Sequence, residues 1–346
     1  MRIVAGLGAV VLACGQALVA ESAGQGPDPA PATVPAPVPT LVAPGVWLLV
    51  GGVPADREPD GNTVVIEAPE GLVVVDTGRH AWHRQAILEL ARRRGRPIAA
   101  IINSHWHLDH VSGNPALRAQ YPGLRVYASD AIDGALAGFL AKSARDAQAY
   151  VDDPQIPESL RADIRADRET IGNGAALRPD VVVDRSGRRH IAGRSVDVHL
   201  ARDAATDGDV WILDRASGVV ALGDLVTLPA PFLDTACPSG WKAALAQVAR
   251  TRFRLAIPGH GAPMDRAQFA RYRRAFEAFI DCSGSDRPRA ACAAGWASDV
   301  QPLLGTGQDE LQRARSMAGY YVDALRTGGG RSPYCNEPRG PVAPRS

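Results

Sequence analysis

A dense run of metal-binding residue types follows an apolar segment of this chain. Residues 98–103 are almost entirely apolar, which predicts a buried strand. The residues that follow are His105-Trp106-His107-Leu108-Asp109-His110. His105 and His107 can converge on one ion from a turning loop, while Asp109 and His110 reach a second. The run therefore predicts a metal site, which is a better explanation than a chance cluster of solvated histidines.

The segments before this motif predict an α/β fold. Residues 45–50, 62–67 and 72–75 have the composition of strands, and Pro69-Glu70-Gly71 joins the last two in a hairpin. A helix with Ile87, Leu90 and Ala91 on one face precedes the strand at 98–103. A strand, helix and strand with ionisable residues at the carboxyl end of the second strand are typical of α/β proteins.

The remainder of the chain predicts further helices and strands. Residues 130–170 are expected to be helical, with a break at 154–157. Strands are expected near 181–183, 196–200, 210–213 and 219–222. Asp265 should cap a helix, and a last helix should include residues 311–325.

The histidine motif resembles the HxHxDH signature of the metallo-β-lactamase superfamily. The resemblance extends upstream to Asn62–Ile66 and Asp76-Thr77-Gly78, and downstream to Gly223-Asp224 and Pro258-Gly259-His260-Gly261, in the order of the family. It implies a four-layer α/β (α+β) fold, the αβ/βα sandwich, with its site at one edge between two sheets.

The resemblance also implies metal ligands and a reaction. It assigns His105 and His107 to a first metal, Asp109, His110 and His260 to a second, and Asp224 to a bridging position. One or two zinc ions are expected, and iron or manganese also suits such an oxygen-rich set. The predicted reaction is hydrolysis by metal-bound hydroxide of an ester-, thioester-, lactone- or amide-like bond in a small molecule. Asp109 would orient the nucleophile or accept its proton.

One position departs from the family pattern. Where the family usually has His-Thr-x-Gly-Asp, this chain has Ala205-Thr206-Asp207-Gly208-Asp209, so a third histidine is missing. His199 and Asp207 are the candidate substitutes, although a strand histidine is more often packed and hydrogen-bonded. Two metals, one metal at the second position, and a non-catalytic binding protein with a degraded site all remain open. The retained ligands favour an enzyme, because clustered buried carboxylates are costly without a function. A β-lactamase is a further alternative, but β-lactamases of this family generally keep that histidine.

Several other residues near these motifs have less specific roles. His80 and His83 are expected at the surface near the site mouth, and His190 in a solvated turn. Asp76 is expected to order its loop rather than bind metal, and Trp106 to line the pocket or pack in the core.

The N-terminus predicts an exported bacterial protein. A charged start, an apolar run at 3–13 and small residues indicate a signal peptide or lipoprotein signal within residues 1–20. Cys14 is a candidate lipid attachment site, and hence a membrane tether, while cleavage near Ala17 or Ala20 fits equally well. Such a protein would be periplasmic or anchored in the outer membrane. Residues 21–44 should form a Pro/Ala-rich linker, 45–281 the main domain, and 282–346 a helical extension and tail.

Four cysteines follow the signal, and an even number in an oxidising compartment predicts disulfides. Three pairings are open. Cys282 with Cys292 closes a short loop and is favoured, which leaves Cys237 for Cys335.

The chain also gives some indication of its partners. Gly223 to Cys237 is similar to zinc metallohydrolases associated with periplasmic quinoprotein (pyrroloquinoline quinone) systems, which implies a quinoprotein dehydrogenase system as a partner. The net charge is only +1 and the charged residues are scattered, so no nucleic-acid surface is expected.

Overall fold

The computed structural model describes residues 35–54, 56–305 and 308–335. The predicted signal, Cys14 and most of the predicted linker lie outside these residues. Within them, no helix combines the length and the apolar character that a membrane span requires.

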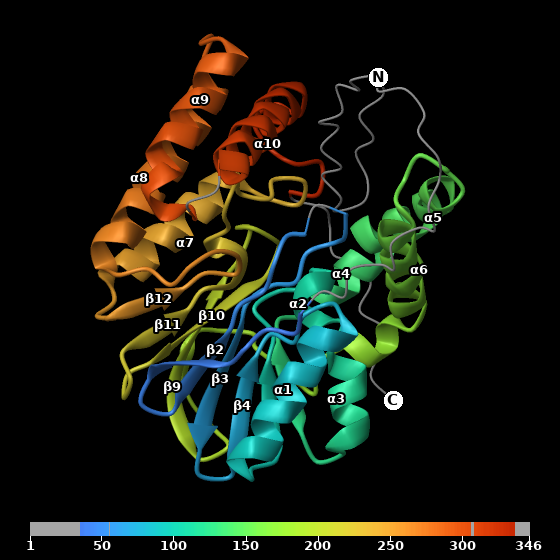
Figure 1. Ribbon diagram of the computed structural model, residues 1–346. Helices are drawn as coiled ribbons and strands as arrows, with labels where there is room; N and C mark the ends of the chain where they lie inside the picture. The colour runs from blue at the N-terminus through green and yellow to red at the C-terminus, as the bar shows by residue number, and fades with distance from the viewer. Residues whose placement is uncertain (1–34, 55, 306–307, 336–346) are drawn as a thin grey trace.

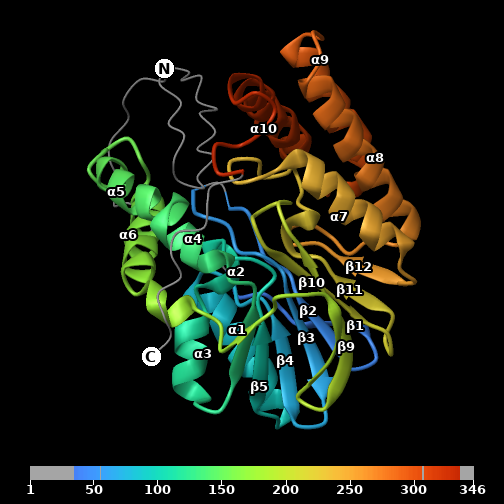
Figure 2. The same ribbon diagram turned by 180° about the vertical axis from the view of Figure 1, so that it is seen from behind.

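Two sheets form the centre of the molecule (Figures 1 and 2). Among the described residues, the first has seven strands in sequence order: β1 (Thr40–Ala43), β2 (Val46–Leu49), β3 (Thr63–Ala68), β4 (Gly71–Val75), β5 (Ile98–Ile102), β6 (Arg125–Ala128) and β7 (Val181–Val182). The second has five, in the order β12-β11-β10-β9-β8: β8 (Gly187–Ile191), β9 (Arg194–Ala201), β10 (Asp209–Asp214), β11 (Val219–Ala221) and β12 (Leu255–Ile257).

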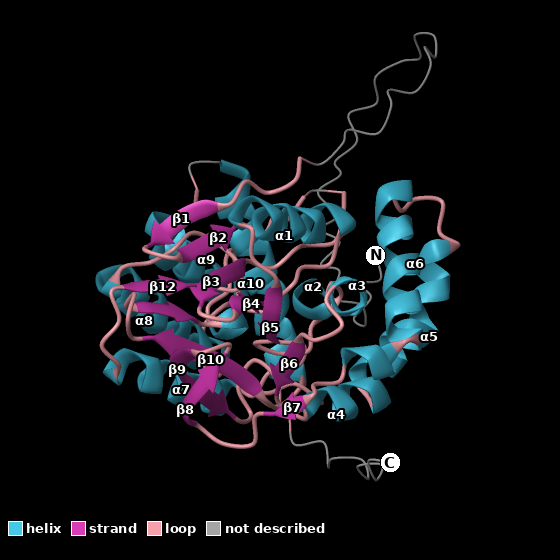
Figure 3. Cartoon of the chain, turned by 90° about the horizontal axis from the view of Figure 1, so that it is seen from below, coloured by secondary structure: helices cyan, strands magenta, loops and turns pink. Residues whose placement is uncertain are grey.

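Helices cover the outer faces of both sheets and extend beyond them. In the described part of the chain they are α1 (Ala81–Arg94), α2 (Leu108–Val111), α3 (Asn114–Gln120), α4 (Ala131–Ala137), α5 (Phe139–Val151), α6 (Glu158–Gly172), α7 (Pro238–Arg250), α8 (Arg266–Ser283), α9 (Arg289–Val300) and α10 (Gln308–Thr327). Figure 3 shows α5 and α6 standing to one side of the sheets, next to α4.

Three apolar layers hold these elements together. Side chains such as Ile66 and Val73 of the first sheet meet Val198 and Ile212 of the second in the central layer. On the far face of the first sheet, α1 buries the apolar residues that the sequence places on one side of it. On the far face of the second, α7 to α10 pack over a large aromatic and aliphatic cluster. This arrangement is the predicted αβ/βα sandwich, and the fold prediction is confirmed.

The predicted strand–helix–strand unit is present, and it places the histidine motif. β4 and β5 are parallel neighbours, and α1 connects them. Gly95 ends α1 in the left-handed conformation, with φ of 60°, as its sequence position indicates. β11 and β12 are also parallel, and the loops after β5, β11 and β12 carry the predicted ligands. The carboxyl ends of these strands therefore build one site.

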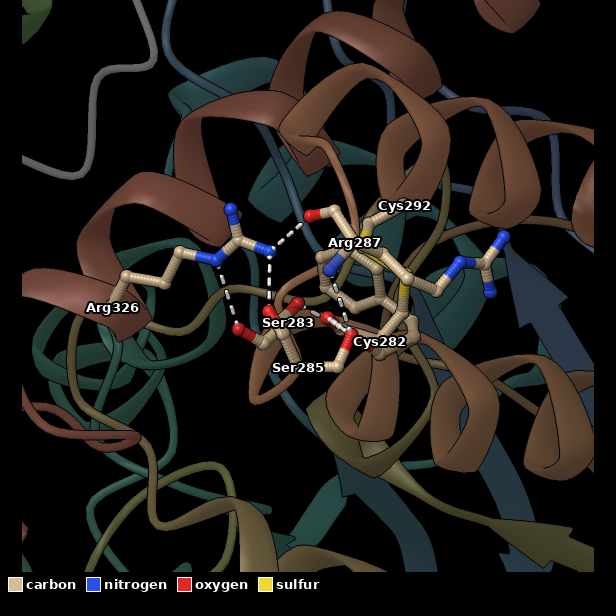
Figure 4. The surroundings of a disulfide bond; sticks show 7 residues. Cys282, Ser283, Ser285, Arg287, Cys292 and Arg326 are labelled. Atoms are coloured by element: carbon tan, nitrogen blue, oxygen red, sulfur yellow. Dashed lines mark hydrogen bonds between the residues drawn. A yellow bond between two sulfur atoms is a disulfide. The ribbon is translucent and has the colours of Figure 1, made fainter.

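Two disulfides stabilise the C-terminal third of the chain. Cys282 pairs with Cys292 and Cys237 pairs with Cys335, which confirms the favoured prediction. The first joins the end of α8 to α9. Arg326, from the end of α10, donates to the carbonyl groups of Ser283, Ser285 and Arg287 beside it (Figure 4).

Some local predictions were wrong. β1 occupies residues 40–43, within the stretch expected to be an extended linker. His190 lies in β8 rather than in a turn, because it pairs with Ser195 in a hairpin that turns at Ala192 and Gly193. The predicted capping of α8 by Asp265 is confirmed, and Gln268 completes a capping box.

Candidate metal centre

His105, His107 and Asp224 form the first of two candidate metal positions. Their ligand atoms face one another: His105 Nε2 lies 3.6 Å and His107 Nδ1 lies 3.7 Å from Asp224 Oδ2. Both histidines lie in the loop between β5 and α2, whereas Asp224 lies in the turn after β11. All three residues are buried.

Asp109, His110 and His260 form the second position. His260 Nε2 lies 2.9 Å from Asp109 Oδ2 and 3.3 Å from His110 Nε2. The other oxygen of Asp224, Oδ1, lies 3.2 Å from His110 Nε2 and 3.6 Å from His260 Nε2. The two carboxylate oxygens of Asp224 thus face different positions, which is the geometry of a bridging ligand.

Hydrogen bonds around the site leave the inward-facing nitrogens free for metal. Ser104 Oγ donates to Asp76, so it must accept from His105 Nδ1 at 2.9 Å. Thr235 Oγ1 donates to the Ala205 carbonyl, so it must accept from His107 Nε2 at 3.1 Å. His110 Nδ1 donates to Asp76 Oδ2 at 2.9 Å. Such outer contacts fix the tautomer and orientation of metal-binding imidazoles.

Asp76 orders the loop, as predicted. Besides His110, it accepts from the Ser104 backbone N–H at 2.7 Å. Its φ is 61°, an unfavourable conformation for a residue with a side chain. The strained turn aims the carboxylate behind the histidine motif, and strain of this kind clusters at functional sites.

The donor set fits metal ions. His105 Nε2 and Asp224 Oδ1 are buried and have no hydrogen-bond partner among the described residues. Buried polar atoms are rarely left without a partner, so these two atoms point to a bound cation. Two groups of imidazole and carboxylate ligands are typical of zinc. Glycine backbone makes room for them, because a Cβ at Gly259 would collide with the Asp224 carboxylate.

The electrostatics of the site also favour positive charge. Burial opposes charge on His110, but Asp109, Asp224 and Asp76 raise its pKa well above the usual value. Burial also works against ionisation of Asp224, yet His110 and His260 hold the pKa of its carboxyl well below the usual range. Burial lowers the pKa of His107 to about 4, so this imidazole is neutral at pH 7 and can bind metal.

Neither candidate substitute for the missing histidine joins the site. His199 stacks on Trp211, with ring centroids 3.7 Å apart, on the outer face of the second sheet. Asp207 is partly exposed and lies outside both ligand groups of the described residues. Ala205 is buried among apolar side chains, and its carbonyl is bound by Thr235. The first position therefore has three protein ligands, including Asp224.

A cavity of about 640 Å³ opens above the two positions. His107, Asp109, Asp224 and His260 lie in its floor. Trp106 both lines the cavity and packs against Phe139, with ring centroids 5.5 Å apart. The two roles predicted for Trp106 are thus combined.

Arg79 links the second position to α6. Its buried guanidinium lies 3.9 Å from Asp109 Oδ1 and 3.7 Å from Glu58 Oε2, and it forms a short ion pair with Asp167. Burial raises the pKa of Glu58 to about 7, although the Arg79 charge opposes this shift. Through these contacts, Arg79 links the loop before β3 and α6 to Asp109, a candidate metal ligand.

The predictions for His80 and His83 were wrong, because both residues are buried. His80 Nδ1 lies 2.8 Å from Asp60 Oδ2, and His83 Nε2 lies 2.8 Å from Thr63 Oγ1. They begin α1 beneath the Asp76 turn and support it.

The comparisons with known proteins agree with this geometry. A model of the metallo-beta-lactamase superfamily matches residues 56–276, which is more than half of the chain. This chain belongs to that superfamily. A solved metallo-beta-lactamase from Pontibacter korlensis has a TM-score of 0.51 at 16% identity, over 69% of this chain and 98% of its own.

Similarity to curated members of the superfamily is local. A linear primary-alkylsulfatase from Pseudomonas sp. is 36% identical over 73 residues, which are 20% of this chain and 14% of that protein. A hydroxyacylglutathione hydrolase from Gloeobacter violaceus is 40% identical over 72 residues, which are 21% of this chain and 27% of that protein. The matched segments thus span well under two thirds of these relatives. The chain has the fold and the buried His/Asp metal site of the superfamily's metallo-hydrolases, and the alternative of a degraded site is not supported.

The residues that support the candidate ligands were not predicted from the sequence. Arg79 directly follows the Asp76-Thr77-Gly78 motif, and this position was a usable signal. Glu58 and Asp167 lie in segments without a motif, and the resemblance of residues 223–237 assigned no role to Thr235, so only the folded chain brings these residues to the site.

Proposed function

We propose that the protein hydrolyses an ester-, thioester-, lactone- or amide-like bond of a small molecule outside the cytoplasm. The bridging geometry of Asp224 between two ligand groups is the observation that carries this proposal. The relatives reported above are, by name, a hydrolase of hydroxyacylglutathione and an alkylsulfatase. Both names support the cleavage of ester-like bonds.

The residues of the chain would have distinct roles in this reaction. When bound, zinc would polarise the carbonyl oxygen and lower the pKa of a water molecule. His105, His107 and Asp224 would hold the ion at the first position, and Asp109, His110 and His260 the ion at the second. The Asp109 carboxylate faces both His260 and the cavity, so it is placed to orient the attacking water or accept its proton. Arg79, beside the other oxygen of Asp109, positions that carboxylate.

The location and the partner belong to the same proposal. Two disulfides suit an oxidising compartment, which supports export through the predicted signal. The similarity of residues 223–237 to quinoprotein-associated metallohydrolases supports a function beside a periplasmic quinoprotein dehydrogenase. Thr235 lies in that segment and supports His107, so the segment is part of the site.

A panel of chromogenic substrates tests the proposal. Purified protein is given an ester, a thioester, a lactone, a phosphodiester and a β-lactam, before and after treatment with a chelator. We expect hydrolysis of an acyl substrate that disappears with chelator, returns with zinc, and is absent from Asp224→Ala. Turnover of the β-lactam alone would restrict the activity to that amide-like bond and exclude the ester, thioester and lactone. Turnover that persists in Asp224→Ala would show that the assigned site is not responsible.

A further inference from the structure

The cavity above the metal positions has one apolar wall, next to the first position. The rings of Trp106 and Phe232 both contact His107 edge-on, with centroid distances of 4.6 Å and 5.0 Å. Phe139 lies beside both, 5.5 Å from Trp106 and 6.4 Å from Phe232. Leu140 continues the wall along α5.

The same apolar surface continues onto a second group of helices. Met317 of α10 lines the cavity and is only partly buried, as is Phe232. Figure 1 shows α10 and α5 on opposite sides of the upper part of the molecule. The apolar surface is therefore shared by two helical groups around the space above His107.

The buried charged side chains of the cavity lie next to the second position, in ion pairs, whereas Asp309 and Arg313 of α10 line the cavity without a salt bridge to another described residue, Arg313 donating to the Val53 carbonyl. Arg79 is surrounded by Asp167, Glu58 and Asp109. Arg57, nearer the mouth, forms a 2.8 Å ion pair with Asp163. An ionic substrate group would have to break these buried pairs, at a large cost. Close to the metal positions, binding energy is therefore expected to come chiefly from the apolar wall.

We propose that the substrate carries an apolar acyl, alkyl or aryl group held against Phe232, Phe139 and Met317. A cavity of about 640 Å³ falls in the range that holds drug-sized ligands. The apolar group lies on the His107 side, and the bond to be cleaved lies over Asp224. This inference names the substrate class for the hydrolysis proposed above and rests on that proposal for the reaction itself.

Calorimetry with butanoate, hexanoate, octanoate and decanoate tests the inference on the purified zinc-loaded protein. The carboxylate is constant, so the change in affinity with chain length reports on the apolar wall. Each buried methylene is expected to tighten binding about fourfold, and octanoate, with four more methylenes, should bind about 250-fold more tightly than butanoate. Hydrolysis of the p-nitrophenyl esters of the same acids is measured in parallel.

Three variants locate the effect. Phe232→Ala and Met317→Ala shorten the wall from its two sides, so the dependence on chain length should weaken in both. Tyr121→Ala is the control, because Tyr121 is a partly buried aromatic residue that packs on the far face of the first sheet. It should keep the full dependence on chain length.

The outcomes separate the two proposals. Equal affinity for all four acids would overturn the assigned substrate class, even if every ester were hydrolysed. A steep dependence on chain length that Phe232→Ala and Met317→Ala both leave unchanged would also overturn it. A steep dependence that both variants weaken, without hydrolysis of any ester, would support the apolar subsite and contradict the ester reaction.

Discussion

The side chain of Thr235 lies between His107, a candidate metal ligand, and the backbone of Ala205. Ala205 is the residue at the position where the family usually has a histidine. The Thr235 hydroxyl accepts from His107 Nε2 at 3.1 Å and donates to the Ala205 carbonyl at 2.9 Å. The side chain is buried. Thr235→Val keeps the shape of the side chain and removes both hydrogen bonds.

The magnitude of the effect follows from these contacts. Metal binding through Nδ1 requires the proton on His107 Nε2, and in the variant that proton has no acceptor. A buried donor left without a partner costs about 1–3 kcal/mol. Because the metal-free imidazole can reorient to avoid this cost, most of it should appear as lost affinity. We expect zinc to bind the first position about 10- to 100-fold more weakly, the range typical for outer contacts of metal ligands.

Competition with a chromophoric chelator measures the two zinc affinities separately. The first position has fewer candidate protein ligands and should be the weaker zinc site. Its zinc affinity should fall in Thr235→Val, while the affinity of the second position should keep its value. Thr251→Val is a matched control, since it removes a partly buried hydroxyl that donates to Val248 at the end of α7. Equal losses of affinity at both zinc positions, or no loss at either, would show that Thr235 does not specifically support the first position.

Three further predictions concern metal content and stability. Elemental analysis should find two zinc ions per chain. Asp224→Ala should lose metal from both positions, because Asp224 faces both. Full retention of metal in this variant would exclude the bridging role. Burial raises the pKa of Glu58 from 4.5 to about 7, so the folded chain holds a proton that the unfolded chain releases, and stability should fall as pH rises through this window. The loss of unfolding free energy attributable to Glu58 is about 3 kcal/mol, and Glu58→Gln should remove this pH dependence. Urea unfolding curves measured at pH 5 and pH 8 test it, and curves identical for the variant and the parent would contradict the prediction. Cys335→Ser opens a disulfide that spans 98 residues and should cost about 4 kcal/mol in urea unfolding, more than Cys292→Ser, whose disulfide spans 10.

The resemblance to the family predicted the candidate ligands because they lie in short motifs that occur in the order of the family. His105 to His110 follow an apolar strand directly, and Gly223-Asp224 and Gly259-His260 each follow another. The resemblance to the family grouped these motifs, and the structure gives the physical reason, because parallel strands bring such loops to one edge. The same local logic predicted the cap at Asp265 and the end of α1 at Gly95.

The residues that support the candidate ligands could not be predicted in this way. Thr235 and His107 are 128 residues apart, and Arg79 and Asp167 are 88 apart. No local pattern marks such pairs, because tertiary packing alone brings them together. His80 and His83 were assigned to the surface for a related reason: their partners Asp60 and Thr63 lie on a neighbouring segment whose contact with α1 has no sequence signature.

The Cys237–Cys335 disulfide has a consequence for the integrity of the chain. It closes a covalent ring that contains α7 to α10 and His260, while the other five metal ligands lie before it. A single protease cut in the exposed turn around Asp286 would open the ring without releasing any segment. The cut protein would keep its full mass under non-reducing conditions and separate into fragments only after reduction. After such a cut, both disulfides would keep α9 and α10 joined to the part of the chain that carries all six candidate ligands.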